Sequence, residues 1–149
     1  MNQKGSSEVS REAESDAKEG QSFILGLWGV RYQVKDVSRS VAFYTKQLGF
    51  KLDQQNLPAF AQVSVGALKL ILSGPGASGS RPMPDGRQQE PGGWNRFMII
   101  TNDIDGLIGR LNTGGVKFRG EISEAGAGRA RLLEDPSGNL IELFEFKKK

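Results

Sequence analysis

The chemistry open to this chain is narrowed by two residue types that its 149 residues lack, histidine and cysteine. Histidine is the commonest ligand of transition metals and the usual general base near neutral pH, and cysteine thiolates build disulfides and zinc sites. A serine triad, a thiol dyad and a His-rich metal centre are therefore excluded. Any catalysis must use carboxylates, Lys, Tyr, Ser, backbone groups or a borrowed cofactor.

Two further features could suggest chemistry, but neither predicts a phosphate loop or a nucleic-acid partner. The run Gly126-Ala127-Gly128-Arg129 lacks the Lys-Ser/Thr continuation and the helix that a phosphate loop needs, so we interpret it as a loop or bulge between strands. The formal net charge is +3, and residues 147–149 supply three lysines. The rest of the chain has no stripe of Lys and Arg with interleaved aromatics, so we expect no nucleic-acid partner.

Composition divides the chain into a tail, one domain and a short basic end. Residues 1–22 are rich in Ser, Glu, Lys and Gly, so we expect them to be a disordered tail. Residues 23–146 have the length of one ordinary domain, and residues 147–149 form a basic tail. No apolar run approaches the length of a membrane span and no secretory signal is evident, so we expect no membrane partner and a cytoplasmic location.

The first part of the domain, module one at 27–73, predicts a strand, a helix and three further strands. Residues 27–34 alternate between apolar and small or polar side chains, which is typical of a half-buried strand. Asp36 or Ser38 can cap the helix, and Gly49 ends it. The buried side of this helix carries Val37, Val41, Tyr44 and Leu48. The three strands that follow are expected at 50–53, 60–65 and 68–72.

A connection at 74–93, rich in Gly, Pro, Ser and Gln, then leads to a second copy of the same pattern. Because it is long for a compact domain, it is either a plain linker or also a lid. Module two, at 94–146, predicts a strand at 94–101 and a helix capped by Asp103 or Asp105. Three more strands are expected at 116–119, 130–134 and 140–146. The carboxylates Glu134 and Asp135 lie at the turn before the last strand, where we expect capping or surface groups.

The two modules align as an internal repeat. Asp36 superposes on Asp103, and the apolar helix positions then coincide; near the module ends, Gly66 superposes on Gly138. A single unit of this kind has an exposed sheet edge and one uncovered face, and pairing two units closes a cup. Trp28 and Trp94 stand at matching strand starts, where we expect buried packing, with stacking on a ligand as the alternative.

Two motifs in this repeat resemble those of a known superfamily. The first motif resembles the "V-x-D-[LV]…F-Y…L-G-F" opening of vicinal oxygen chelate proteins and covers residues 34–37, Phe43-Tyr44 and 48–50. The second resembles their "D-P-x-G-N-x-[IL]-E-L" ending and covers residues 133–139 and 141–143. The superfamily includes glyoxalase I, extradiol dioxygenases, fosfomycin-modifying enzymes, epimerases and bleomycin-resistance proteins that only bind. The resemblance implies an α+β fold of two βαβββ modules, forming a cupped mixed sheet with helices outside, and a homodimer.

The resemblance also implies four positions for metal ligands, two from each module. They fall here on Gly29, Arg96, Glu142 and Leu70, or on Ile71 if the alignment is shifted by one residue. Glycine has no ligating side chain and a guanidinium does not ligate. One carboxylate does not hold a divalent ion tightly, so we expect no metal and no other cofactor.

The strand alternation extends this set to a predicted site. If Gly29 faces the cup, so do Arg31 and Gln33, and the cup becomes mainly apolar with a few polar anchors. The predicted ligand-binding residues are Arg31, Gln33, Leu70, Arg96, Met98 and Phe144, and the predicted catalytic residue is Glu142. Arg31 or Arg96 could hold a carboxylate or phosphate. Alternatively, Arg96 pairs with Glu142 and fills the metal position, and Arg31 is a solvated rim residue.

Three functions follow as hypotheses. The first is a protein that binds a small apolar or anionic molecule in the cup without a catalytic metal. The second is a lyase, isomerase or dioxygenase of glyoxalase type with an atypical site. The third is an interaction protein whose cup is vestigial. The missing ligands favour the first hypothesis over the second.

Overall fold

The structure, a computed structural model, describes residues 23–148 and consists of two modules with the same element order. The predicted tail at 1–22 lies outside the described residues. Module one contains β1 (Val30–Gln33), α2 (Val37–Ala42), the π-helical turn η1 (Phe43–Gln47), β2 (Lys51–Asn56), β3 (Phe60–Val65) and β4 (Leu68–Ser73). After a 3₁₀ turn, η2 (Ser78–Ser80), module two contains β5 (Arg96–Ile100), α3 (Ile104–Thr113), β6 (Lys117–Ala125), β7 (Gly128–Glu134) and β8 (Leu140–Phe146).

Each module forms a four-stranded mixed sheet, and the two sheets have the same topology. The strand orders are β1-β4-β3-β2 and β5-β8-β7-β6. In both, the first strand pairs parallel with the last, and the other pairs are antiparallel. The predicted α+β fold with two βαβββ modules is thereby confirmed. No helix among residues 23–148 is long and apolar enough to cross a bilayer.

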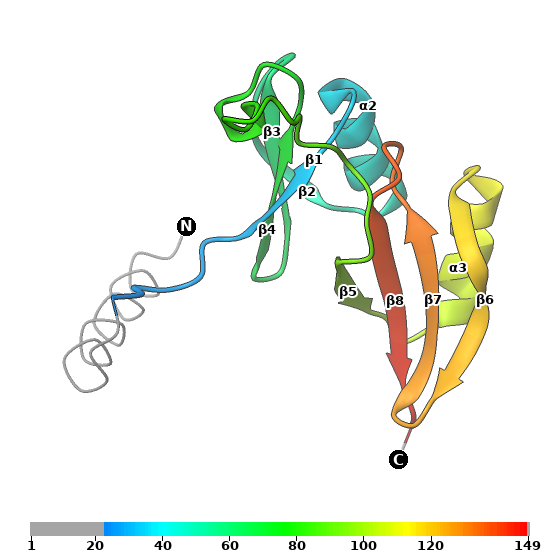
Figure 1. Cartoon of the computed structure of the whole chain (residues 1–149). Helices are drawn as coiled ribbons and strands as arrows, with labels where there is room; N and C mark the ends of the chain where they lie inside the picture. The colour runs from blue at the N-terminus through cyan, green and yellow to red at the C-terminus, as the bar shows by residue number, and fades with distance from the viewer. Residues whose placement is uncertain (1–22, 149) are drawn as a thin grey trace.

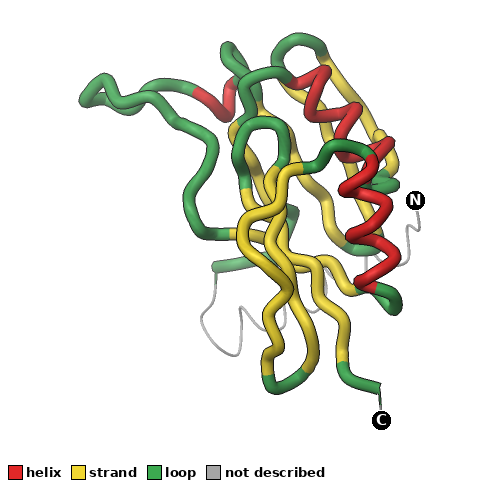
Figure 2. Tube along the Cα trace, turned by 90° about the vertical axis from the view of Figure 1, so that its right-hand side faces the viewer, coloured by secondary structure: helices red, strands yellow, loops and turns green. Residues whose placement is uncertain are grey.

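Both helices lie on the same side of the strands, as Figure 1 and Figure 2 show. The side chains beneath them form one continuous core drawn from both modules, with Val63, Leu70 and Leu72 from the first and Ile104 and Leu143 from the second. Each sheet therefore has a helix-covered face and a face without a helix. We call the latter the open face of its module.

The first helix departs from the predicted continuous α-helix. It changes to π geometry at Phe43 and keeps it as far as Gln47. The Thr45 hydroxyl donates to the carbonyl of Val41 at 2.7 Å. Such a bond from a side chain to the preceding turn competes with the regular helical ladder, which is a physical reason for the local change in winding.

The turn at 135–139 joins the modules, and this corrects the prediction that Asp135 is a capping or surface group. Asp135 is only 4% exposed. Its Oδ1 accepts hydrogen bonds from the backbone amides of Ser137 and Asn139. Its Oδ2 accepts from the Tyr44 hydroxyl at 2.9 Å and from the side-chain amide of Asn139 at 3.0 Å. Because Tyr44 belongs to module one, the carboxylate is a buried link between the two halves.

Asn139 extends this link to β1 and to the connection. Its side-chain amide donates to the carbonyl of Gln33 at 2.8 Å, and its side-chain oxygen accepts from the amide of Gly92. Nearby, the Tyr32 hydroxyl donates to the carbonyl of Leu140 at 2.7 Å and accepts from the amide of Phe97 at 3.3 Å. The D-P-x-G-N motif therefore fixes the junction of the modules.

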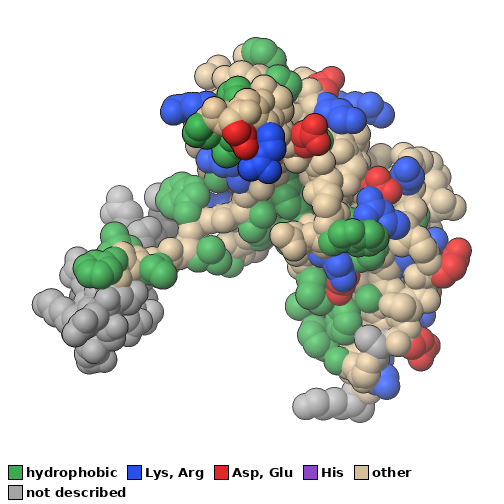
Figure 3. Space-filling view, viewed as in Figure 1, with side chains coloured by type: hydrophobic (Ala, Val, Ile, Leu, Met, Phe, Trp, Pro, Cys, Tyr) green, Lys and Arg blue, Asp and Glu red, His purple; other side chains and the backbone are tan. Residues whose placement is uncertain are grey.

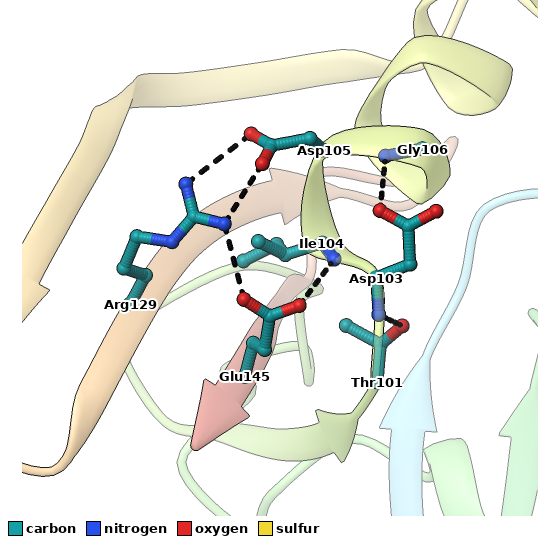
Figure 4. Close-up of polar contacts among 7 residues, drawn as sticks. All are labelled: Thr101, Asp103, Ile104, Asp105, Gly106, Arg129 and Glu145. Carbon is teal, nitrogen blue, oxygen red and sulfur yellow. Dashed lines mark hydrogen bonds and ion pairs between the residues drawn. The ribbon is translucent and has the colours of Figure 1, made fainter. Parts of the chain in front are cut away.

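A second polar cluster ties the start of α3 to its own sheet (Figure 4). Arg129 on β7 pairs with Asp105 at 2.8 Å and with Glu145 on β8 at 3.0 Å. Glu145 in turn accepts from the amide of Ile104 at the first helical position, while Asp103 caps the helix by accepting from Gly106. The guanidinium lowers the pKa of both Asp105 and Glu145.

Candidate functional site

The open face of module one carries the side chains that β1 turns away from its helix. Arg31 pairs in register with Ile71, and Gln33 with Ser73. The neighbouring β3 adds Gln62, which pairs with Ile71. Arg31 is anchored here because its Nη1 donates to the buried Ser73 hydroxyl at 2.6 Å. The guanidinium is therefore anchored to the strand, although Arg31 as a whole is exposed to solvent.

A cavity of about 220 Å³ lies on this face, with all of its walls in module one or the start of the connection. Its walls combine aromatic and aliphatic side chains with one guanidinium and two amides. They are Trp28, Arg31, Gln54, Phe60, Gln62, Ile71, Ala77 and Ser78. Apolar walls with a few polar anchors are the usual composition of a small-molecule site.

The connection folds back over the same face. Gln33 donates to the carbonyl of Gly79 at 2.9 Å and accepts from the Ser80 hydroxyl at 2.8 Å, and its amide also reaches Gln89 at 3.2 Å. A Cβ added to Gly79 would overlap the guanidinium of Arg31, so a larger residue here would displace the end of the Arg31 side chain. Gln33 is thereby engaged by the connection, and that segment covers one end of the open face.

The prediction that Leu70 faces the cup is wrong. Leu70 pairs with Val30, is fully buried, and belongs to the core beneath α2. Ile71, the one-residue alternative, takes the open-face position. The alignment of Gly66 with Gly138 fails by one residue because the turn before β4 spans only two residues, whereas the turn before β8 spans five.

The open face of module two carries Arg96 and Glu142 as an ion pair. The alternating residues of β5 and β8 share this face, since Arg96 pairs with Leu140, Met98 with Glu142, and Ile100 with Phe144. The Nε of Arg96 donates to Glu142 at 2.8 Å, and its Nη1 donates to the carbonyl of Trp94 at 3.2 Å. The structure therefore contains the Arg96–Glu142 pair that the sequence offered as an alternative.

Around this ion pair the face is apolar and open to solvent. Met98 is 54% exposed, Ile100 67% and Phe146 55%, and the Phe146 ring packs edge-on against the buried Phe144 ring. In Figure 3, hydrophobic side chains gather on this side of module two. Three large apolar side chains this exposed on one sheet mark a surface suited to a further contact.

The predicted site residues are therefore divided between two faces. Arg31 and Gln33 lie on module one, while Met98, Phe144 and the Arg96–Glu142 pair lie on module two. The cavity next to Arg31 draws nothing from module two. Their roles in binding or catalysis stay predictions.

The four positions expected for metal ligands hold a poor donor set. In module one, a Cβ added to Gly29 would come within 2.5 Å of the Lys69 carbonyl oxygen, so a ligating side chain has no room there. In module two, the Glu142 carboxylate is already paired with a guanidinium. Among residues 23–148, no three Asp or Glu side chains gather in a way that could hold an ion. These residues do not fit a divalent metal.

The expectation of buried tryptophans is also wrong. Trp28 is 67% exposed and Trp94 70% exposed. Each indole instead lies under a cation, with the Lys69 ammonium 3.9 Å from the Trp28 ring centroid and the Arg119 guanidinium 5.1 Å from that of Trp94. Trp28 also lines the cavity of module one, and the alternative that it stacks on a ligand stays a prediction.

Sequence reasoning missed the side chains that β2 and β3 contribute to this cavity. Gln54, Phe60 and Gln62 lie on these strands, and Gln54 pairs with Gln62 in register. The signal was available in the alternation of 60–65, where Gln62 and Ser64 interrupt the apolar positions. The ligand positions that the resemblance implies fall on other strands, so they do not point to these side chains.

Neither buried tyrosine is suited to act as a base. Burial raises the pKa of the Tyr32 hydroxyl to about 12. Burial also raises the pKa of Tyr44, and the adjacent Asp135 carboxylate raises it further. Both hydroxyls are therefore neutral at physiological pH, where they donate hydrogen bonds across the module junction.

The fold and these motifs agree with a match to a protein family. The chain matches the model of the Glyoxalase/Bleomycin resistance protein/Dioxygenase superfamily over residues 27–143, and it belongs to this family. The family corresponds to the vicinal oxygen chelate class that the two sequence motifs indicate. No curated protein matches the chain.

Solved structures share the fold over most of the chain. A lactoylglutathione lyase from Agrobacterium tumefaciens is 19% identical, with a TM-score of 0.66 and coverage of 83% of this chain and 96% of the other. A superfamily member from Sphaerobacter thermophilus is 25% identical, with a TM-score of 0.62 and coverage of 82% and 99%. FosX, a fosfomycin resistance protein from Listeria monocytogenes, is 19% identical, with a TM-score of 0.64 and coverage of 84% and 96%.

Proposed function

We propose that this chain binds a small apolar or anionic molecule on its open faces and does so without a catalytic metal. The observation that carries the proposal is the Arg96–Glu142 ion pair, in which a guanidinium neutralises the single carboxylate at the expected ligand positions. The cavity beside Arg31 supports it, because anchored guanidinium and amide groups there stand among apolar walls. A carboxylate or phosphate on the ligand would suit either guanidinium.

We further propose that the site is completed in a homodimer. In one chain, module one offers polar anchors and a cavity, while module two offers exposed apolar side chains and the ion pair. A two-fold pairing would let the open face of module one in one protomer meet that of module two in the other. It would also remove Met98, Ile100 and Phe146 from water.

An enzyme with an atypical site is the second candidate, since Glu142 is a carboxylate that is 12% exposed in the middle of an apolar face. A ligand group that displaces Arg96 would free this carboxylate for proton transfer. Under this hypothesis Glu142→Gln abolishes turnover but leaves binding in place. Loss of binding and turnover together would assign Glu142 to binding alone.

Elemental analysis and a ligand screen test the main proposal together. The purified protein should hold far less than one divalent ion per chain, and chelation should leave its thermal transition unchanged. A screen by thermal shift should then find an anionic compound that raises the transition, because a ligand stabilises the state it binds. Arg96→Ala should lower the affinity for that compound. Arg87→Ala, at an exposed side chain, should leave the affinity unchanged. One tightly held ion per chain, lost in Glu142→Gln, would overturn the metal-free site.

A further inference from the structure

A second cavity lies on the helix side of the molecule, away from both open faces. It encloses about 460 Å³, within the range of small-molecule sites. Module one supplies one wall through α2 and η1, and module two supplies the other through the turn after α3, the start of β6 and the 135–139 turn. In Figure 1, that turn, coloured orange to red, stands between α2 and the start of β6.

The charges around this cavity favour an anion. Its walls carry the cations Arg39, Lys46 and Lys117 and the carboxylates Glu134 and Asp135. Both carboxylates are already engaged. Asp135 accepts four hydrogen bonds within its turn and from Tyr44, and Glu134 pairs with Lys117 at 3.6 Å and with Arg119 at 3.4 Å.

Two of the cations, by contrast, are uncommitted. Among residues 23–148, neither Arg39 nor Lys46 makes an ion pair, and their side chains donate no hydrogen bond. They stand on one helical segment, facing a cavity with the partly exposed Val116 on its opposite side. A guanidinium and an ammonium on one rim can meet the oxygens of a phosphate.

The backbone that carries Lys46 is unusual and is fixed by cross-module contacts. Lys46 and Gln47 belong to the π-helical turn, a geometry that occurs frequently at functional sites. Gln47 donates to the carbonyl of Gly114 at 3.3 Å, and Arg110 donates to the carbonyl of Lys46 at 3.4 Å. These contacts close one end of the cavity and hold Lys46 opposite the start of β6.

We propose that this cavity is a second binding site, specific for a small phosphate ester. A phosphate monoester carries a charge of about −1.5 to −2 at neutral pH, which matches the two uncommitted cations. Its organic part would lie against Ala42, Phe43 and Val116, so an ester binds more tightly than inorganic phosphate. Because both modules form the walls, the ligand stabilises their junction.

Calorimetry at constant ionic strength tests this site, with phenyl phosphate and inorganic phosphate as probes. Phenyl phosphate should bind saturably at one site per chain and more tightly than inorganic phosphate. Lys46→Gln should lower the affinity for phenyl phosphate about tenfold, which is the loss expected for one charge-assisted hydrogen bond. Lys46→Arg should keep the affinity. Lys51→Gln removes the same charge on β2, outside this cavity, and should change the affinity less than about twofold.

Amide chemical shifts locate the ligand and separate this proposal from that for the open faces. Binding should shift the amides of Gly114, Gly115 and Lys117 and leave those of Arg31 and Ile71 in place. Shifts at Arg31 and Ile71 instead would overturn the second site. Equal losses in Lys46→Gln and Lys51→Gln, or no saturable binding at millimolar phenyl phosphate, would overturn it as well.

Discussion

At the scale of single residues, Leu70 and Ile71 show how one position in a strand decides whether a side chain supports the fold or a site. Leu70 is fully buried beneath α2, whereas Ile71 lines the cavity of module one. In the segment Leu68–Ser73 both polar residues, Lys69 and Ser73, share the face of Ile71, so the alternation places Leu70 inward, and the alignment of the module ends led to the wrong face. In Leu140–Phe146 the alternation alone is ambiguous, because Glu142 lies on the open face and Glu145 lies on the opposite face against the start of α3.

The two residues should therefore respond differently to truncation. Leu70→Ala should lower the free energy of unfolding by about 3 kcal/mol, because it leaves a cavity in a closed core. Ile71→Ala should lower the free energy of unfolding by about 1 kcal/mol, since this side chain is only half-buried. It should also lower the affinity for any ligand of the module-one cavity. Urea denaturation measures the first effect and titration the second. Equal destabilisation by the two substitutions would contradict this assignment of faces.

At the scale of elements, the sequence predicted most strands and both helices, since alternation and helical spacing are local properties. It did not predict the π turn, in which the Thr45 hydroxyl donates to the carbonyl of Val41. It also placed Asp135 at the surface, because nothing local shows that Tyr44 lies across the junction, 91 residues away in sequence. The residues most visible as motifs thus position the modules, while the cavity walls come from weaker patterns.

The Arg129 cluster predicts how the attachment of α3 depends on pH. Arg129 lowers the pKa of Asp105 and Glu145 below their ordinary values of 3.8 and 4.5. A carboxylate with a lowered pKa stabilises the fold above its ordinary pKa, and this contribution is lost as the pH falls through the lowered value. The urea midpoint of Arg129→Gln should accordingly be below that of the wild type at pH 7, and the difference should shrink below about pH 4.

The matched control is Arg87→Gln, which breaks an ion pair with Asp85 between two exposed side chains. Exposed pairs contribute little, so this substitution should leave the midpoint nearly unchanged at every pH. A difference between the wild type and Arg129→Gln that stays constant from pH 7 to acid would show that the carboxylates do not sense Arg129.

At the scale of the whole molecule, the repeat explains why one chain has two open faces, one on each module. The helix-covered faces of both modules share one core, so the open faces cannot also cover each other along their whole length. Duplication of the module was readable from the sequence, because the order of strands and helix recurs. The division of the predicted cup into two faces was not readable, since it depends on how the modules join through Asp135 and Asn139.

This arrangement predicts a dimer that can be dissociated by a change on module two. Light scattering should give twice the chain mass of 16.2 kDa. Ile100→Glu, which puts a charge on an apolar surface that is 67% exposed in one chain, should shift the protein to the monomer and raise its dissociation constant at least about tenfold. Met83→Glu changes an apolar side chain in the connection that is 40% exposed and should leave the dimer intact. A monomeric wild type, or a dimer that tolerates Ile100→Glu as well as Met83→Glu, would mean that each open face functions without a partner.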